Sequence, residues 1–108
     1  MRLHETFEWD PDKAIRNAKK HGVKFEDAAI TLEDEDASLF HVESFDSAHS
    51  EAEDRYVTIA SHPFDRSIVL KITWTVRDSS DGRVTRIISA RNASPAEVKK
   101  YADEVYGS

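Results

Sequence analysis

The sequence predicts an α+β domain in which helices cover one face of an antiparallel sheet. Two observations support this fold class. The element patterns follow one another as a short strand, two helices, a run of strands and a last helix, and two long segments alternate apolar and polar residues. With 108 residues, the chain is long enough for one hydrophobic core, so we expect residues 1–108 to form a single domain.

The N-terminal quarter of the chain predicts a strand and two helices. Residues 4–9 alternate enough for a short strand, and Asp10 and Pro11 then supply a helix N-cap and a first helical residue. Gly22 is the expected C-terminal cap, and a second short helix is expected over residues 25–32. The predicted apolar stripe of the first helix consists of Ala14, Ile15, Ala18 and His21.

The middle of the chain predicts strands. Residues 37–42 and 55–62 favour short strands, and the polar residues 43–54 between them favour a loop. Two longer strands follow, separated by a turn at residues 78–82.

Alternation in the two long strands predicts a cationic face. In the first strand, one side is polar and includes Lys71 and Arg77, and the other side is apolar. In the second strand, strict alternation places Arg83 and Arg91 on one side and Arg86 on the opposite side. These cations either form a binding surface or are ordinary solvated sheet residues that discourage aggregation. A last helix follows, with Ser94 and Glu97 spaced as a capping box.

Charge is distributed unevenly along the chain. The net charge is −6, but residues 25–54 carry no Lys or Arg, whereas residues 66–100 carry eight basic and three acidic residues. The acidic segment is either a solvated flank or a surface for a basic partner such as a DNA-binding subunit. The chain has no cysteine and no apolar run of the roughly 18 residues that a membrane span needs, so we expect a cytoplasmic protein.

Several motifs, taken in order, resemble the BrnT toxin family over about residues 7–101. They are Phe7 to Pro11, Lys20 to Gly22 with Phe25 to Ala28, His49 to Glu51 with Glu53 to Tyr56, Thr75 to Arg77, and Arg86 to Arg91 with Ser94, Glu97 and Tyr101. The resemblance implies a RelE-like sheet with two N-terminal helices and one C-terminal helix. It also implies an endoribonuclease toxin of a type II toxin-antitoxin system. The expected inhibitor is a BrnA-like ribbon-helix-helix antitoxin, through which the toxin would contact operator DNA.

Metal-independent RNA cleavage by the ribose 2′-hydroxyl needs fixed cations for the developing charge and groups that transfer protons. The first catalytic candidates are Arg55, Arg77 and Arg91, because a guanidinium binds phosphate through two hydrogen bonds. For proton transfer we expect His49 and Glu53. No histidine pair has metal-ligand spacing, so we expect neither a metal nor another cofactor.

The sequence also offers candidates for RNA binding outside the catalytic step: Lys20, His21, Lys71, Arg83, Arg86 and Tyr101. Some of these have structural alternatives. Lys20 and His21, at the end of the first helix, would interact favourably with the helix dipole. The helical position of Tyr101 also suits packing in the core. A second function is therefore open: a catalytically inactive RelE-like module that only pairs with the antitoxin and modulates operator binding.

Overall fold

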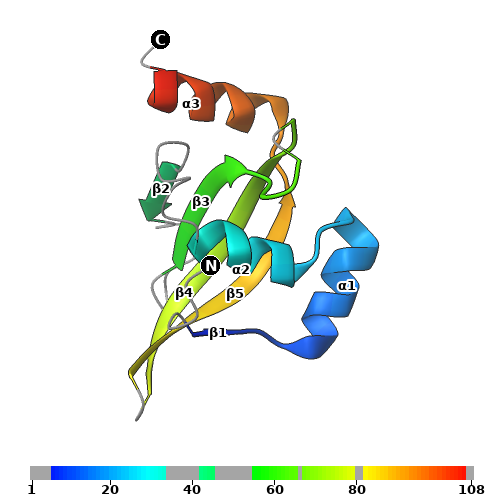
Figure 1. Ribbon diagram of the computed structural model, residues 1–108, viewed down its shortest axis with the longest axis vertical. Coiled ribbons are helices and arrows are strands. Elements are labelled where there is room, and N and C mark those ends of the chain that lie inside the picture. The colour runs from blue at the N-terminus through cyan, green and yellow to red at the C-terminus, as the bar shows by residue number, and fades with distance from the viewer. Residues whose placement is uncertain (1–5, 34–41, 46–54, 66, 80–81, 107–108) are drawn as a thin grey trace.

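The computed structural model describes residues 6–33, 42–45, 55–65, 67–79 and 82–106. These residues form three helices and a five-stranded mixed sheet with the strand order β1-β5-β4-β3-β2, which confirms the α+β fold class (Figure 1). The elements are β1 (Phe7–Glu8), α1 (Pro11–His21), α2 (Phe25–Glu33), β2 (Val42–Phe45), β3 (Arg55–Ser61), β4 (Val69–Ser79), β5 (Gly82–Asn92) and α3 (Pro95–Tyr106).

Four of the strands pair antiparallel, and only β1 pairs parallel, with β5. The prediction for β2 was partly wrong, because residues 43–45 continue a strand where the sequence favoured a polar loop. Residues 37–41, where that strand was expected to begin, lie outside the described residues. The turn between the long strands is also shorter than predicted, since Ser79 pairs with Gly82.

Local capping forms the helices as predicted. The Asp10 carboxylate accepts hydrogen bonds from the backbone N–H groups of Asp12 and Lys13, which begins α1. Gly22 ends α1 with a φ of 71°, a left-handed conformation that glycine adopts without a Cβ clash. In α3, the Glu97 carboxylate accepts from the Ser94 N–H at 2.8 Å and the Ser94 hydroxyl accepts from the Glu97 N–H at 3.3 Å. The predicted capping box is therefore present.

The main core lies between the sheet and the first two helices. Phe25 and Ala28 of α2 pack there against Leu70, Ile72 and Ile87 of the two long strands. Trp9 meets Phe25 edge-on at a centroid distance of 6.1 Å, which closes the core near β1. Figure 1 shows α2 in front of the sheet and α1 beside β5.

A buried amide fixes α1 to the sheet. The Asn17 side chain donates to the Ala90 carbonyl at 2.7 Å and accepts from the Ala90 N–H at 3.2 Å. It thereby satisfies backbone groups of β5 beyond the end of the two-residue β1. The predicted apolar stripe of α1 was wrong at one position: Asn17 faces inward, and Ile15 is 57% exposed.

A β-bulge in β5 changes which residues share a face. Thr73 pairs with Ser89 but Trp74 pairs with Ile87, so Ile88 has no partner in the register. The extra residue reverses the alternation, which lets both Ile87 and Ala90 enter the core. Strict alternation along β5 was therefore the wrong expectation. Before the bulge, odd-numbered residues such as Ile87 face the core; after it, even-numbered residues such as Ala90 do.

The second face of the sheet is not fully open, although the sequence predicted that the helices would cover one face only. Ile59 lies on this face opposite Lys71 and is only 5% exposed. The helix α3 contacts β3 and β2, and its residue Glu97 pairs with Lys71. One helix therefore covers one end of the second face. Toward β1, Thr75 on this face is also buried, whereas Glu8, Arg77 and Arg86 remain partly exposed.

Candidate active site

The sheet register aligns polar side chains across four strands on the second face. Arg55 of β3 pairs with Thr75 of β4, Thr75 pairs with Arg86 of β5, and Arg86 pairs with Glu8 of β1. Directly paired residues have side chains on the same face of a sheet. Arg77 follows Thr75 by two residues and therefore shares this face. The bulge is essential here, because strict alternation placed Arg86 on the opposite face from Arg91.

At the β1 end of this row, one carboxylate binds two guanidinium groups. The Glu8 Oε2 atom lies 2.7 Å from Arg77 Nη1 and 2.5 Å from Arg86 Nη1. The hydrogen bond from Arg86 and the positive charge of Arg77 lower the pKa of Glu8, although partial burial acts in the opposite sense. We call these three residues the Glu8 cluster. Arg77 is 56% exposed and Glu8 is 33% exposed, so an anion from solvent can reach the cluster.

At the α3 end of the same face, a second carboxylate binds two more cations. Arg91 donates from two nitrogens to the two Glu97 oxygens, at 2.9 and 3.0 Å, and Lys71 Nζ lies 3.0 Å from Glu97 Oε2. Burial tends to raise the pKa of Glu97, but the hydrogen bonds from Arg91, the Ser94 N–H and Lys71 lower it to about 2. We call Glu97, Arg91 and Lys71 the Glu97 cluster. It holds the first turn of α3 against the sheet.

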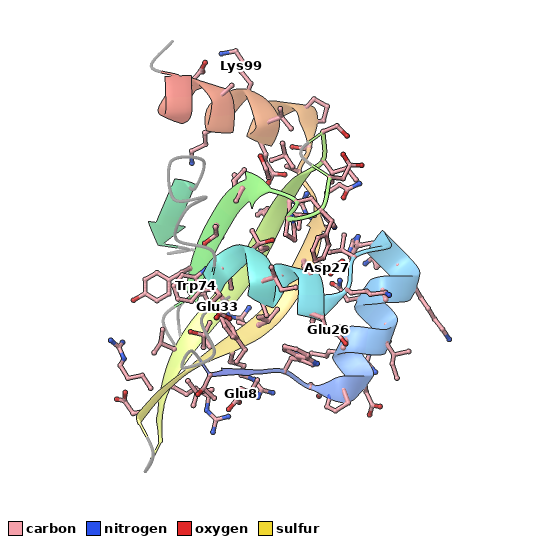
Figure 2. The ribbon with its side chains drawn as sticks, in the orientation of Figure 1. Glu8, Glu26, Asp27, Glu33, Trp74 and Lys99 are labelled. Carbon is pink, nitrogen blue, oxygen red and sulfur yellow. The ribbon has the colours of Figure 1, made fainter. Side chains whose placement is uncertain are left out.

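The structure separates the three arginines that the sequence grouped as catalytic candidates. All three lie on the second face, but Arg55 and Arg77 lie toward the row that contains Arg86, whereas Arg91 lies at the α3 end in the Glu97 cluster. Lys71, the partner of Arg91, and Thr75, the partner of Arg86, are four residues apart along β4. At about 3.3 Å per residue, the strand positions of the two clusters are therefore more than about 10 Å apart. Glu8 and Lys99 lie near opposite ends of the molecule in Figure 2.

The other predicted site residues are dispersed. Lys20 and His21 end α1, which packs beside β5, and neither joins the Glu8 cluster. Arg83 pairs with Asp78 at the end of the long hairpin, on the face opposite Arg86, so the facing expected for it was wrong. Tyr101 belongs to α3. His49 and Glu53 lie outside the described residues.

The two carboxylates were missed as site residues by sequence reasoning. Glu8 stood inside the Phe7 to Pro11 motif, and Glu97 was assigned only to the capping box. The opposite charges of Glu8 and Arg86 on neighbouring strands could have indicated that Glu8 is a site residue. This required knowing that β1 pairs with β5, which are 78 residues apart at this contact.

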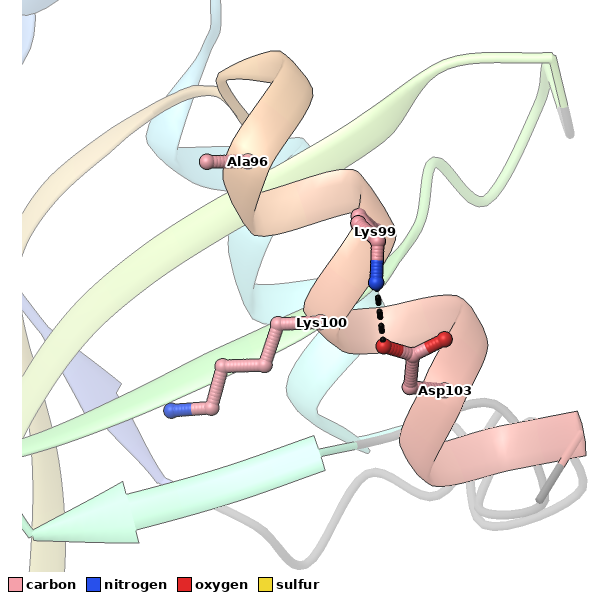
Figure 3. A pocket seen from close by; sticks show the side chains of 4 residues that line it. All are labelled: Ala96, Lys99, Lys100 and Asp103. Carbon is pink, nitrogen blue, oxygen red and sulfur yellow. Dashed lines mark hydrogen bonds and ion pairs between the residues drawn. The ribbon is translucent and has the colours of Figure 1, made fainter. Parts of the chain in front are cut away.

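The described residues offer few alternative sites. No group of three or more His, Asp or Glu side chains comes together there as metal ligands would. A shallow hollow on α3 is lined by Ala96, Lys99, Lys100 and Asp103, and its Lys99 is paired with Asp103 at 3.0 Å (Figure 3). No helix in the described part of the chain is long and apolar enough to cross a membrane.

Comparison with known families decides how this arrangement is interpreted. A family model described as "Ribonuclease toxin, BrnT, of type II toxin-antitoxin system" matches residues 9–97. The chain belongs to the BrnT family. The resemblance seen in the motifs is thus confirmed, and membership of BrnT implies a ribonuclease toxin with an RNA substrate and an antitoxin partner. No curated protein matches the chain.

The BrnT match includes most of the candidate site. It contains Arg55, Arg77 and Arg86 and ends at Glu97 in the first turn of α3. Glu8 directly precedes the matched segment. The family match therefore gives the class of protein, and the contacts of the sheet face give the residues to test.

Proposed function

We propose that this BrnT protein is a metal-independent endoribonuclease whose scissile phosphate binds at the Glu8 cluster. One observation carries the proposal: Arg77 and Arg86 converge on a single carboxylate oxygen on an accessible sheet face. A carboxylate and a phosphate present similar anionic oxygens to a guanidinium. Glu8 thus marks a position where the protein already holds an anion.

Arg55 is the third cation of this proposed site. It lies in the same cross-strand row as Arg86, two strands away, and neighbouring strands are about 4.8 Å apart. Rigid strands hold these groups better than a loop would, which favours stabilisation of charge as it develops on the phosphate. In this scheme the 2′-hydroxyl attacks the adjacent phosphate, a 2′,3′-cyclic phosphate forms and the 5′-oxygen leaves with a proton. His49 and Glu53 remain the candidates for the proton transfers.

Glu8 acts in this proposal as a positioning residue. Without RNA, it offsets part of the positive charge of Arg77 and Arg86 and keeps the two guanidinium groups side by side. An incoming phosphate takes over one or both hydrogen bonds. The hydrogen bond from Arg86 lowers the pKa of Glu8 below its ordinary value of 4.5, so the carboxylate is ionised at neutral pH and also in mildly acidic solution.

The remaining parts of the proposal concern partners. The whole chain, residues 1–108, forms one RelE-like toxin domain in the cytoplasm, where its activity inhibits translation and arrests growth. A BrnA-like ribbon-helix-helix antitoxin neutralises it by covering the cationic face, and the toxin meets operator DNA only through that antitoxin. The uneven charge of the chain supports a basic partner for the acidic residues 25–54.

Cleavage of purified RNA in excess EDTA tests the proposed chemistry. We expect cleavage to persist, with products that end in a cyclic or 3′-phosphate, and DNA to remain intact. Loss of cleavage in EDTA, restored by magnesium, would contradict metal independence. A protein that binds the antitoxin but cleaves no RNA would support the inactive binding module instead.

A further inference from the structure

The outer surface of α1 carries a second set of cations, on a different part of the molecule from the sheet-face clusters. This helix contains four Lys or Arg residues and only one acidic residue, Asp12, although the whole chain has a net charge of −6. The four residues are all exposed: Lys13, Arg16, Lys19 and Lys20. A local excess of positive charge on an acidic protein is the pattern expected of a surface that meets a polyanion.

The α1 cations differ from those of the sheet face in their partners. Every arginine of the Glu8 and Glu97 clusters is bound to a carboxylate. Among the described residues, no carboxylate forms an ion pair with a basic side chain of α1. The N-cap carboxylate of Asp10 accepts the N–H groups of Asp12 and Lys13, and its charge also attracts Arg16 and Lys13 without forming an ion pair with either.

Helical geometry aligns three of these cations. Lys13, Arg16 and Lys20 follow the spacing i, i+3, i+7, so they form one stripe along α1 that extends about 10 Å at 1.5 Å per residue. We call these three residues the α1 stripe. At about 100° per residue, Asn17, which binds Ala90, lies only about 40° to 100° around the helix from these residues, so the stripe borders the packed side of α1. The stripe is therefore held on a fixed element and is exposed along a flank of the helix.

The chain path connects the α1 stripe to the proposed site. Glu8 ends β1, the edge strand, and α1 begins three residues later at Pro11. Three extended residues span at most about 10 Å, so the start of α1 is close to the edge of the sheet beside the Glu8 cluster. Figure 1 shows α1 rising from the end of β1 beside the sheet.

We infer that the α1 stripe binds the RNA backbone of the same strand that enters the Glu8 cluster, several nucleotides from the scissile phosphate. This inference rests on the proposed ribonuclease function. The surface composition favours RNA over a protein segment, because Ile15 is the sole exposed large apolar residue described on α1. Protein-docking surfaces have a contiguous apolar centre, whereas backbone binding of a nucleic acid needs spaced cations.

Two matched double variants test the inference. Arg16→Gln with Lys20→Gln removes two charges from the stripe, and Lys99→Gln with Lys100→Gln removes two exposed charges from α3. The probes are 2′-O-methyl oligouridines, whose blocked 2′-hydroxyl prevents cleavage. One has about 16 nucleotides and one about 4, which bracket the site sizes of small single-strand-binding domains. Affinity is measured for each full-length variant over a series of salt concentrations.

We expect the stripe variant to bind the long oligonucleotide about tenfold more weakly at low salt. The slope of log affinity against log salt should become shallower by roughly 1.4, which corresponds to two lost phosphate contacts on a single strand. Binding of the short oligonucleotide should be unchanged, and the α3 variant should match the parent on both probes.

Equal losses in the two variants, or an equal loss on both probe lengths, would overturn the inference. So would a stripe variant with normal RNA binding and weakened antitoxin binding, which would assign the surface to the protein partner. If the parent cleaves RNA and the stripe variant binds RNA as well as the parent does, the inference is wrong and the proposed ribonuclease function stands. If the parent neither binds nor cleaves RNA, the proposed function fails with it.

Discussion

The Glu8 and Glu97 clusters have the same composition in outline, one carboxylate between two cations on one sheet face, but they differ in what surrounds them. In the Glu97 cluster, Arg91 and Glu97 form two parallel hydrogen bonds, Ser94 adds a backbone hydrogen bond, and the Glu97 side chain is 21% exposed. In the Glu8 cluster, both arginines bind a single oxygen, and Arg77 is 56% exposed.

This difference is why we propose a structural role for the Glu97 cluster and a binding role for the Glu8 cluster. A carboxylate with paired hydrogen bonds at the start of a helix is difficult to displace and links α3 to β4 and β5. A carboxylate held through one oxygen leaves guanidinium N–H groups that can bind another anion. Similar ion pairs can therefore have different roles. The feature that distinguishes them here is whether both carboxylate oxygens, or only one, bind the cations.

The two clusters should differ most when one arginine is removed from each. Arg86→Ala should reduce RNA cleavage by about 10²-fold, since one cation that stabilises the transition state is lost. Growth arrest on expression without antitoxin should be relieved in parallel. Arg91→Ala should instead lower the stability of the fold, with cleavage by the folded fraction close to that of the parent.

Initial rates of cleavage, measured for protein shown to be folded by circular dichroism, check this contrast. If Arg91→Ala loses as much activity as Arg86→Ala while folded, the assignment of the two clusters to different roles is wrong.

A smaller effect is expected from Glu8→Gln. The amide removes a negative charge from the proposed phosphate site, so RNA should bind more tightly and KM should fall. The arginines would be held less firmly, so kcat should fall about tenfold, as expected when reacting groups lose their alignment. Steady-state kinetics on one RNA substrate separate the two constants. An unchanged KM would show that Glu8 does not compete with the phosphate.

Glu97→Gln should affect stability. The pKa of Glu97 is lowered from 4.5 to about 2 in the folded protein, so the ionised carboxylate stabilises the fold above the unfolded-state pKa. This contribution is about 1–2 kcal/mol after allowance for solvent screening, and it should disappear as pH falls from about 5 to 2. Urea unfolding of the parent and the variant at pH 7 and pH 3 checks this. Their stabilities should differ less at the lower pH.

The smallest effect concerns the two faces of β5. Arg83 lies on the same strand as Arg86 but on the opposite face, 77% exposed and 3.8 Å from Asp78. Arg83→Ala should change stability by no more than about 0.5 kcal/mol and cleavage by less than about threefold. A loss comparable to that of Arg86→Ala, in the same cleavage assay, would place RNA on both faces of the hairpin.

Local sequence signals were enough to predict the helices and most of the strands. The limits of α1 follow from Asp10, Pro11 and Gly22, and the start of α3 follows from Ser94 and Glu97. These signals are local, because a cap satisfies backbone groups only two to four residues away. The alternation of β4 is also correct, and the ordered motifs identified the BrnT family, which the family match confirms.

Which cations lie together depends on contacts between distant parts of the chain. The bulge at Ile88 puts Arg86 on the cationic face, because Ile87 and Ala90 both enter the core although they are three residues apart. Glu8 reaches Arg86 through the parallel pairing of β1 with β5, and Glu97 reaches Lys71 because α3 folds back over the sheet. Register and core packing depend on residues far apart in the chain, so local patterns could not specify these contacts.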